Sequence, residues 1–337
     1  MEAFLFRTNL YRRALLPFST TGAMEMVLDA ELNRSIRHPK QVLAIGDSRM
    51  ALRIWLANRM DTGYTFGFAG MAGTLPRVWY YLLRDVDTNR NKYAGILLPV
   101  DDYDDEDWED LGNRSSDLRY LIYRLRYADL FEFAGSHSTR DQQWIAARGT
   151  LLRGLVLKED VQEFLRGPFR RMEDVRGQIG TWYGTQQDYA GPDTTMTGLA
   201  VDWSTREVTY PVRLTAAERK SVDEVLLRGS TQQTGARAAY MRKWFGKIVD
   251  RYEGSRTKLI FYRVPQGPLV RPANPLLRKT HSIRELAAKP NVILLDEHLF
   301  EELEKPELFA DMMHLNAEGS LKFTALLANE VGRVLGQ

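Results

Sequence analysis

Two short segments, far apart in the sequence, carry the residue types of a serine nucleophile and its acid–base partners. Gly46-Asp47-Ser48 follows an apolar run, and Asp311 and His314 lie three residues apart near the end of the chain. This spacing lets the carboxylate hold one imidazole nitrogen while the other nitrogen faces a serine hydroxyl. The pattern therefore predicts nucleophilic chemistry, with Ser48 as nucleophile, His314 as base and Asp311 as the acid that orients it.

Both segments adjoin predicted secondary structure that would position them. Residues 41–46 form a short apolar run that predicts a strand, and residues 49–59 have apolar spacing close to that of a helix. Ser48 would then lie near the positive end of a helix dipole, although a plain N-cap role is the alternative. Near the other end of the chain, Asn316 is the predicted N-cap of a helix over residues 317–335.

Four further apolar runs, each bounded by turn residues, predict strands that are covered on both faces. They are residues 64–68, 93–100, 258–264 and 291–296, and a helix is predicted over residues 76–86. Strands that alternate with helices indicate an α/β protein with a parallel sheet.

The segment over residues 104–235 interrupts this alternation and predicts an inserted cap. It contains predicted helices over residues 117–133, 144–157 and 159–171, a hairpin over residues 201–210 and a capping box at Thr215 and Glu218. The chain thus divides into a lead segment over residues 1–40, a first core part over 41–103, the insertion, and a second core part over 236–337. Candidate platforms for stacking on sugars in the insertion are Trp182, Tyr183, Tyr189 and Trp203.

These motifs resemble those of the SGNH or GDSL hydrolase family. Gly46-Asp47-Ser48 is similar to the nucleophile motif, residues 311–316 are similar to the acid–base motif, and residues 68–73 (FAGMAG) resemble the glycine block. The resemblance covers residues 41–103 and 237–335. It implies a three-layer α/β/α sandwich with a five-stranded parallel sheet in the flavodoxin-like order two-one-three-four-five. It also implies an oxyanion hole made by the backbone N–H groups of Ser48 and Gly73, whereas a close strand-to-helix turn is the alternative for the glycines.

One block departs from the family pattern. Where the family has Gly-x-Asn-Asp, this chain has Pro99-Val100-Asp101-Asp102, so that Asp101 takes the place of the asparagine that donates to the oxyanion. An ionised carboxylate cannot donate a hydrogen bond. Three alternatives stay open: Asp101 is protonated, it has another role, or a donor such as Arg263 or Gln266 replaces it. Arg49 is predicted either to steer an anionic substrate or to form a structural salt bridge.

In length, in its Gly-Asp-Ser-Arg sequence and in its Pro-Gln-Gly-Pro loop, the chain is most similar to bacterial SGNH proteins of cell-envelope polysaccharides. That likeness implies a serine-dependent esterase or O-acyltransferase acting on O-acyl groups, acetyl above all, of carbohydrate. It implies no cofactor and favours an extracytoplasmic location. The alternative is a catalytically degenerate SGNH-fold protein that binds carbohydrate or acts as a scaffold in the cell envelope.

The composition excludes several other functions. The chain has 337 residues, no cysteine and a net charge of +2, so thiolate metal sites, cysteine nucleophiles and nonspecific nucleic-acid binding are not expected. No apolar stretch reaches the roughly 20 residues of a membrane span, and no signal peptide is predicted. A longer natural chain that had lost an N-terminal anchor would look the same.

Several polar clusters have a plain structural interpretation. The acidic run over residues 101–110 lacks the spacing of a calcium loop and is typical of a solvated helix start. Surface or core roles are predicted for four histidines that have no partner at metal-ligand spacing, namely His38, His137, His281 and His298. Packing of the insertion onto the core is predicted for Tyr120, Tyr123 and Tyr127 with Arg119, Arg124 and Arg126.

Overall fold

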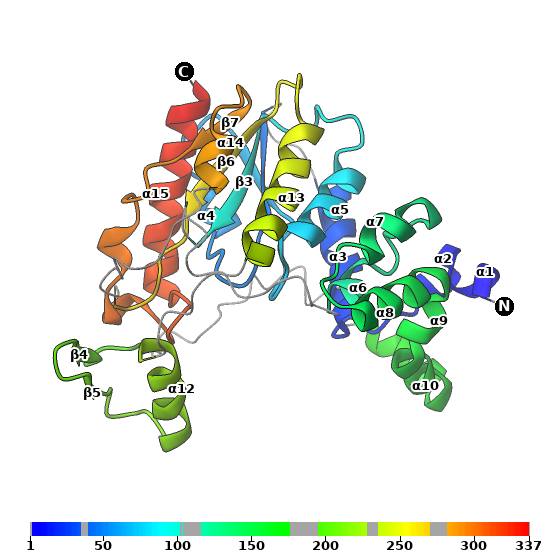
Figure 1. Cartoon of the computed structure of the whole chain (residues 1–337), viewed down its shortest axis with the longest axis horizontal. Coiled ribbons are helices and arrows are strands. Elements are labelled where there is room, and N and C mark those ends of the chain that lie inside the picture. Colours follow the sequence, from blue (N-terminus) through cyan, green and yellow to red (C-terminus); the bar gives the residue numbers. More distant parts are fainter. Residues whose placement is uncertain are drawn as a thin grey trace.

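The structure is a computed structural model that describes residues 2–34, 40–101, 103, 116–175, 195–227, 235–269 and 282–336. A five-stranded parallel sheet lies at its centre (Figure 1). Its strands are β1 (Gln41–Ala44), β2 (Thr65–Phe68), β3 (Gly95–Val100), β6 (Lys258–Arg263) and β7 (Val292–Leu294). They lie in the order β2-β1-β3-β6-β7, which confirms the predicted strand order.

Alternate residues of the strands point to opposite faces of the sheet, and both faces are buried. One face, with Leu43 and Phe261, packs against α3 (Thr20–Leu32), α5 (Pro76–Val86) and α13 (Gly235–Arg251). The opposite face, with Ala44 and Ile260, packs against α4 (Ile54–Ala57) and α15 (Ala317–Gly336). Helices on both faces make this a three-layer α/β protein.

Local sequence signals determine where several helices begin. Pro76 occupies the first turn of α5, where a missing N–H costs no hydrogen bond. Asn316 Oδ1 accepts the N–H of Gly319 at 3.0 Å, which confirms the predicted cap of α15. Thr215 and Glu218 form the predicted capping box at the start of α12 (Ala216–Leu226).

Two helix predictions are wrong. Residues 49–53 are not helical, and α4 begins only at Ile54. Met50 and Leu52 are both buried there, at a two-residue spacing that one face of a helix cannot provide. The helix predicted over residues 117–133 ends with α6 (Ser116–Leu121). The Asp129 carboxylate accepts the N–H of Arg126 at 2.7 Å, which starts a new helical turn, η1 (Tyr127–Asp129).

Two lobes extend from the sheet, on its left and right in Figure 1. The helical lobe contains α6, η1, α7 (Leu130–Ala134), α8 (Arg140–Leu151), α9 (Arg153–Val156) and α10 (Lys158–Arg166), together with α1 (Glu2–Leu5) and α2 (Asn9–Arg12). The hairpin lobe contains β4 (Ala200–Asp202), β5 (Glu207–Thr209) and α12, which confirms the predicted hairpin.

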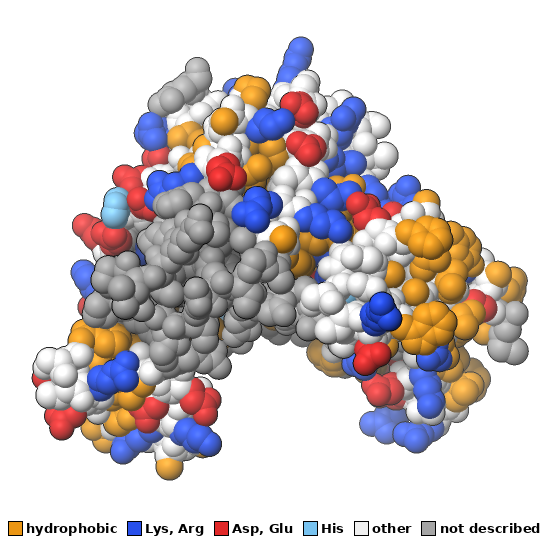
Figure 2. All heavy atoms as spheres, in the orientation of Figure 1, with side chains coloured by type: hydrophobic (Ala, Val, Ile, Leu, Met, Phe, Trp, Pro, Cys, Tyr) orange, Lys and Arg blue, Asp and Glu red, His pale blue; other side chains and the backbone are white. Residues whose placement is uncertain are grey.

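The N-terminal helices hold the helical lobe in place. The Glu2 carboxylate accepts the N–H groups of Arg153 at 2.6 Å and Gly154 at 3.1 Å, so it caps α9. This cap explains why the helix predicted over residues 144–157 is interrupted at Leu152. Large apolar side chains are exposed on this lobe (Figure 2), among them Phe131, Trp144 and Phe169. Among the described helices, none is long and apolar enough to cross a membrane.

A fully buried ion pair connects the core to the helical lobe. Arg77 on α5 and Asp117 on α6 have no exposed side-chain surface, and Arg77 Nε donates to the carboxylate at 2.8 Å. The same guanidinium donates to Ser136 Oγ at 3.0 Å. Because removal of one partner leaves the other charge buried and uncompensated, this pair contributes to the attachment of the lobe.

We expect Arg77→Met to lower the free energy of unfolding by about 3–5 kcal/mol, because Asp117 would lose its buried counter-charge. Urea denaturation followed by circular dichroism measures this change. Arg333→Met is the matched control, because the Arg333 side chain is 59% exposed and its pair with Glu330 lies on the surface. Arg333→Met should lower the free energy of unfolding by less than about 1 kcal/mol. Equal, small losses in the two variants would contradict the role of the buried pair.

Candidate active site

Three side chains form a chain of hydrogen bonds at the carboxyl edge of the sheet. The distance from Ser48 Oγ to His314 Nε2 is 2.9 Å, and His314 Nδ1 lies 2.8 Å from Asp311 Oδ2. With Asp311 accepting the proton of Nδ1, the lone pair of Nε2 is left to accept the Ser48 hydroxyl proton. His314 is buried, whereas Met313 beside it is 52% exposed. The structure thus brings together the three residues predicted for nucleophilic chemistry.

Ser48 lies in a tight turn after β1 and not at the start of a helix. The Asp47 carboxylate accepts the N–H of Arg49 at 2.9 Å, and the Asp47 carbonyl accepts the N–H of Met50 at 3.2 Å. The predicted helix dipole at Ser48 is therefore wrong, because α4 begins six residues later and has only four residues. The Asp47 side chain builds this turn.

The glycine block forms a loop that closes over the same turn. Gly73 has φ of +73°, a left-handed conformation that glycine adopts at little cost. The Gly46 carbonyl accepts the N–H of Met71 at 3.0 Å. The Thr74 hydroxyl lies between two carbonyl acceptors, that of Met71 at 2.7 Å and that of Gly46 at 3.1 Å. Among the described residues, no acceptor is paired with the backbone N–H of Ser48 or of Gly73. These two donors are therefore available to a ligand.

Two residues that support this loop were not singled out as functional from the sequence. Thr74 also accepts the indole N–H of Trp79 at 3.0 Å, which anchors the loop to α5. The Tyr120 hydroxyl donates to the Ala72 carbonyl at 2.6 Å, so α6 supports the peptide that precedes Gly73. The prediction that Tyr120 packs the insertion onto the core is confirmed, but its contact with the glycine loop had no local signal in the sequence.

The loop that carries Asp311 and His314 is attached to the hairpin lobe. The Met196 N–H approaches the carbonyls of Phe309 at 2.9 Å and Pro306 at 3.1 Å. Arg213 donates to the Ala310 carbonyl at 3.2 Å. Within the loop, the Ala310 N–H donates to the His314 carbonyl at 2.9 Å, closing a small hairpin. The inserted segment therefore helps to position the acid–base pair.

Hydrogen bonds control the ionisation of Asp311. Partial burial by itself raises the pKa of this carboxyl group. The His314 side chain and the backbone N–H of Met313, which donates at 2.8 Å, outweigh burial and hold the pKa below its ordinary value of 3.8. Asp311 is therefore a carboxylate at neutral pH, as an acceptor for His314 must be.

The four further predicted site residues form a polar network beside Ser48. Arg49 Nη2 donates to Asp47 Oδ2 at 2.8 Å, and Arg49 Nη1 forms an ion pair with Asp101. Gln266 Nε2 donates to the Asp101 carbonyl at 3.0 Å. Asp101 therefore has another role, that of binding Arg49, and the salt-bridge prediction for Arg49 is confirmed.

Arg263 belongs to the same network, because it shares an acceptor, Glu304, with the backbone of Gln266. Its Nη1 donates to Glu304 Oε1 at 2.9 Å, and the Gln266 N–H donates to the same oxygen at 2.9 Å. Burial raises the pKa of Glu304, although both donors act in the opposite direction. Arg263 and Gln266 thus both make supporting contacts in this network.

The remaining polar predictions have structural roles where the structure describes them. His137 is buried against the carbonyls of Phe133 and Ala134, and exposed His298 pairs with Glu301. No group of three His, Asp or Glu side chains suited to a metal ion occurs among the described residues. Several predictions lie outside the described residues, namely those for His38, His281, Trp182, Tyr183 and Tyr189. The same holds for the acidic residues at positions 102 and 104–110.

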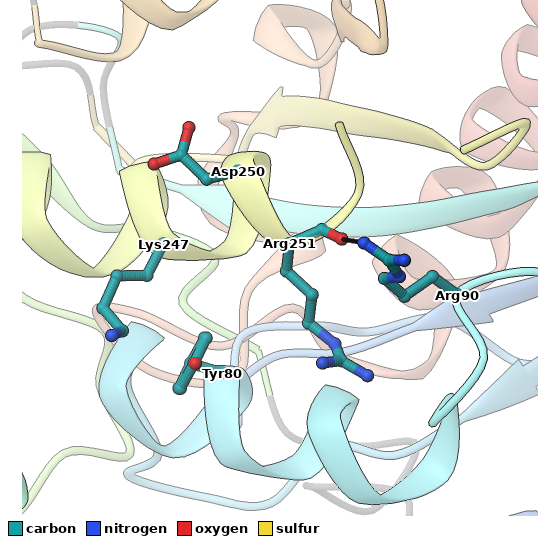
Figure 3. A pocket seen from close by; sticks show the side chains of 5 residues that line it. All are labelled: Tyr80, Arg90, Lys247, Asp250 and Arg251. Carbon is teal, nitrogen blue, oxygen red and sulfur yellow. Dashed lines mark hydrogen bonds between the residues drawn. The ribbon is translucent and has the colours of Figure 1, made fainter. Parts of the chain in front are cut away.

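A separate cavity of about 400 Å³ lies between α5 and α13 (Figure 3). It is lined by Tyr80, Arg90, Lys247, Asp250 and Arg251. The ends of these two helices lead into β3 and β6 at their amino ends, so the cavity lies at the edge opposite Ser48. Arg251 donates to the Asp87 carbonyl at 2.6 Å, and Arg90 donates to the Arg251 carbonyl at 3.4 Å. These arginines therefore satisfy carbonyls where the helices end.

No family model and no curated protein matches this chain. The site can nonetheless be interpreted from its chemistry. A serine hydroxyl bonded to an imidazole, which is in turn bonded to a carboxylate, can act as a nucleophile, and two unpaired backbone N–H groups beside it can stabilise an oxyanion.

We expect Gly73→Ala and Gly63→Ala each to lower the free energy of unfolding by about 1–2 kcal/mol, because both glycines have left-handed φ values of +73° and +72°. Only Gly73→Ala should slow the covalent labelling of Ser48 by a fluorophosphonate, because Gly63 lies in the turn before β2 at the opposite edge. Urea denaturation and mass spectrometry measure the two effects. If Ser48 were labelled at the same rate in Gly73→Ala and Gly63→Ala, the Gly73 N–H would have no role in the reaction of Ser48.

The depressed pKa of Asp311 predicts a dependence of stability on pH. Its carboxylate contributes stability that is fully present above the unfolded pKa, about 3.9, and is lost as the pH falls through the lower folded value. The difference in unfolding free energy between the wild type and Asp311→Asn should therefore shrink as the pH falls below about 4. Urea titrations at each pH measure it. If this difference in unfolding free energy did not change at low pH, the lowered pKa of Asp311 would be contradicted.

Proposed function

We propose that this chain is a serine-dependent esterase or O-acyltransferase of the SGNH type, acting on O-acyl groups of carbohydrate, acetyl in particular. The observation that carries the proposal is the hydrogen-bond chain from Ser48 through His314 to Asp311 at the carboxyl edge of a parallel sheet. Open α/β sheets bind their ligands at this edge. The strand order and the motifs around Ser48 and His314 support membership of the SGNH group.

The reaction is a double displacement. His314 Nε2 takes the proton of Ser48 Oγ while the oxygen attacks the ester carbonyl carbon, and the Asp311 carboxylate stabilises the imidazolium that forms. The N–H groups of Ser48 and Gly73 hold the oxyanion. Collapse of the tetrahedral intermediate breaks the bond to the alkoxide, which takes the proton from His314, and leaves an acyl group on Ser48.

The second half of the reaction defines whether the protein is a hydrolase or a transferase. His314 removes a proton from water or from a sugar hydroxyl, the oxygen attacks the acyl-Ser48 carbonyl, and Ser48 is released with its proton restored. Water gives the free acid, and a sugar gives its acyl ester. The chemistry requires no cofactor for either outcome. The attachment of the acid–base loop to the hairpin lobe supports a role for the insertion in selecting the acceptor.

We expect Ser48→Ala to lower the hydrolysis of 4-nitrophenyl acetate by at least about 10⁴-fold, because the nucleophile is lost. Ser255→Ala is the matched control, because Ser255 lies in the turn between α13 and β6, at the other edge of the sheet. Its rate should equal that of the wild type. Release of nitrophenol and of acetate measures the reaction, with and without an oligosaccharide acceptor.

The products distinguish the proposal from its alternative. Serine-dependent release of acetate alone identifies an esterase, and an acetylated oligosaccharide found by mass spectrometry identifies an acyltransferase. Should the wild type and Ser48→Ala be equally inactive toward a panel of acyl esters, the proposal is wrong. The degenerate carbohydrate-binding or scaffolding protein, for which Asp101 is the supporting feature, would then take its place.

A further inference from the structure

In the SGNH pattern that this chain resembles, the position of Asp101 holds a residue that donates a hydrogen bond to the oxyanion. Asp101 follows β3 directly, beside the turn that carries Ser48. The two segments are in close contact, because a Cβ added to Gly46 would lie 2.8 Å from Pro99 Cγ. A carboxylate there repels a developing oxyanion unless a cation offsets it.

Arg49 is a cation that lies between the carboxylates of Asp47 and Asp101. Its Nε lies 3.1 Å from Asp47 Oδ2 and its Nη2 2.8 Å from the same oxygen, while Nη1 pairs with Asp101. Two carboxylates from different segments thus hold the guanidinium at both ends. The side chain is 25% exposed, so solvent or a substrate reaches it.

The guanidinium retains donors after these ion pairs are made. An arginine side chain has five N–H groups, of which Nε–H, one on Nη2 and one on Nη1 point to carboxylates. One N–H on each terminal nitrogen remains, and no other described group accepts it. Of the two other donors near Asp101, Gln266 Nε2 binds the Asp101 carbonyl and Arg263 binds Glu304. The Arg263 side chain is 11% exposed, against 25% for Arg49, so Arg49 is the more accessible cation.

From this arrangement we propose that Arg49 is a catalytic residue that donates to the oxyanion through its guanidinium. The inference rests on the proposed function and adds a charged third donor to the N–H groups of Ser48 and Gly73. Asp47 and Asp101 act as positioning residues, because they hold the guanidinium in one orientation. A donor that carries a full positive charge also offsets the negative charge of Asp101 beside the reacting atoms.

The experiment compares Arg49→Met and Arg49→Lys with the wild type in the hydrolysis of 4-nitrophenyl acetate and in inhibition by methylboronic acid. The boronic acid forms a bond from Ser48 Oγ to boron, His314 takes the serine proton, and the anionic tetrahedral boronate imitates the intermediate. Arg49→Met should lower kcat by about 10²-fold or more, with KM changed less than about threefold, and weaken boronate binding by a similar factor. Arg49→Lys should retain an intermediate rate.

Three controls separate this role from a structural one. Arg59→Met removes a cation from the exposed end of α4 and should leave kcat unchanged. Thermal unfolding identifies any variant that has lost its fold, and Arg49→Lys keeps the positive charge if Arg49→Met does not fold. Asp101→Asn tests the positioning role: it should lower kcat, but by less than Arg49→Met does, because Asp47 still holds the guanidinium through two nitrogens.

The outcomes test the inference separately from the proposed function. A wild type with serine-dependent activity and a folded Arg49→Met variant within threefold of its kcat would overturn the role of Arg49 and leave the esterase proposal intact. A rise of about 10²-fold in kcat for Asp101→Asn would also overturn it, because the wild-type site would then lack a third donor. Inactivity of the wild type and Ser48→Ala alike would instead overturn the proposed function, and the inference with it.

Discussion

The carbonyl oxygen of Gly46 is the contact on which the rest of the site depends. It accepts a hydrogen bond from the Met71 N–H, and the Thr74 hydroxyl lies 3.1 Å away, so the loop after β2 is held against the turn after β1. The α-carbon of Gly46 lies against Pro99, which brings the end of β3 to the same point. Parallel strands end at one edge of a sheet, and this contact turns that shared edge into a site of defined geometry. A side chain at position 46 would separate the three segments.

The acid and the base reach this edge by a different route. They come from a loop that precedes α15, and that loop is held from outside the sheet by the hairpin lobe through Met196 and Arg213. The distance of 2.9 Å between Ser48 and His314 therefore depends on the inserted segment as well as on the core. Where an insertion supports the catalytic loop, changes in substrate contacts and changes in catalysis are coupled.

The charged side chains beside Ser48 form a second constraint on the geometry of the site. Asp47 and Asp101 place two negative charges beside Ser48, and Arg49 is held between them. The network continues through Gln266 to Glu304 and Arg263, so the guanidinium is held within a continuous set of polar contacts. In such a network each charge has a partner, and Arg49 keeps donors that a ligand can use. The negative charge of Asp101 is thus offset by the guanidinium of Arg49.

Several features of the fold and the site can be predicted from local chemistry. The strands, the caps at Asn316 and Thr215, and the pairing of Asp311 with His314 follow from apolar runs and from residues three positions apart. Tertiary structure alone decided the non-helical path of residues 49–53, because their burial depends on contacts such as that of the Arg53 N–H with Thr324 at 2.9 Å. It also decided the ion pair of Arg49 with Asp101 and the support of Ala72 by Tyr120, which join residues 52 and 48 positions apart. Local sequence patterns cannot predict such pairs. The paired residues come together only when the sheet folds and brings the carboxyl ends of its strands, with the segments that follow them, to one edge.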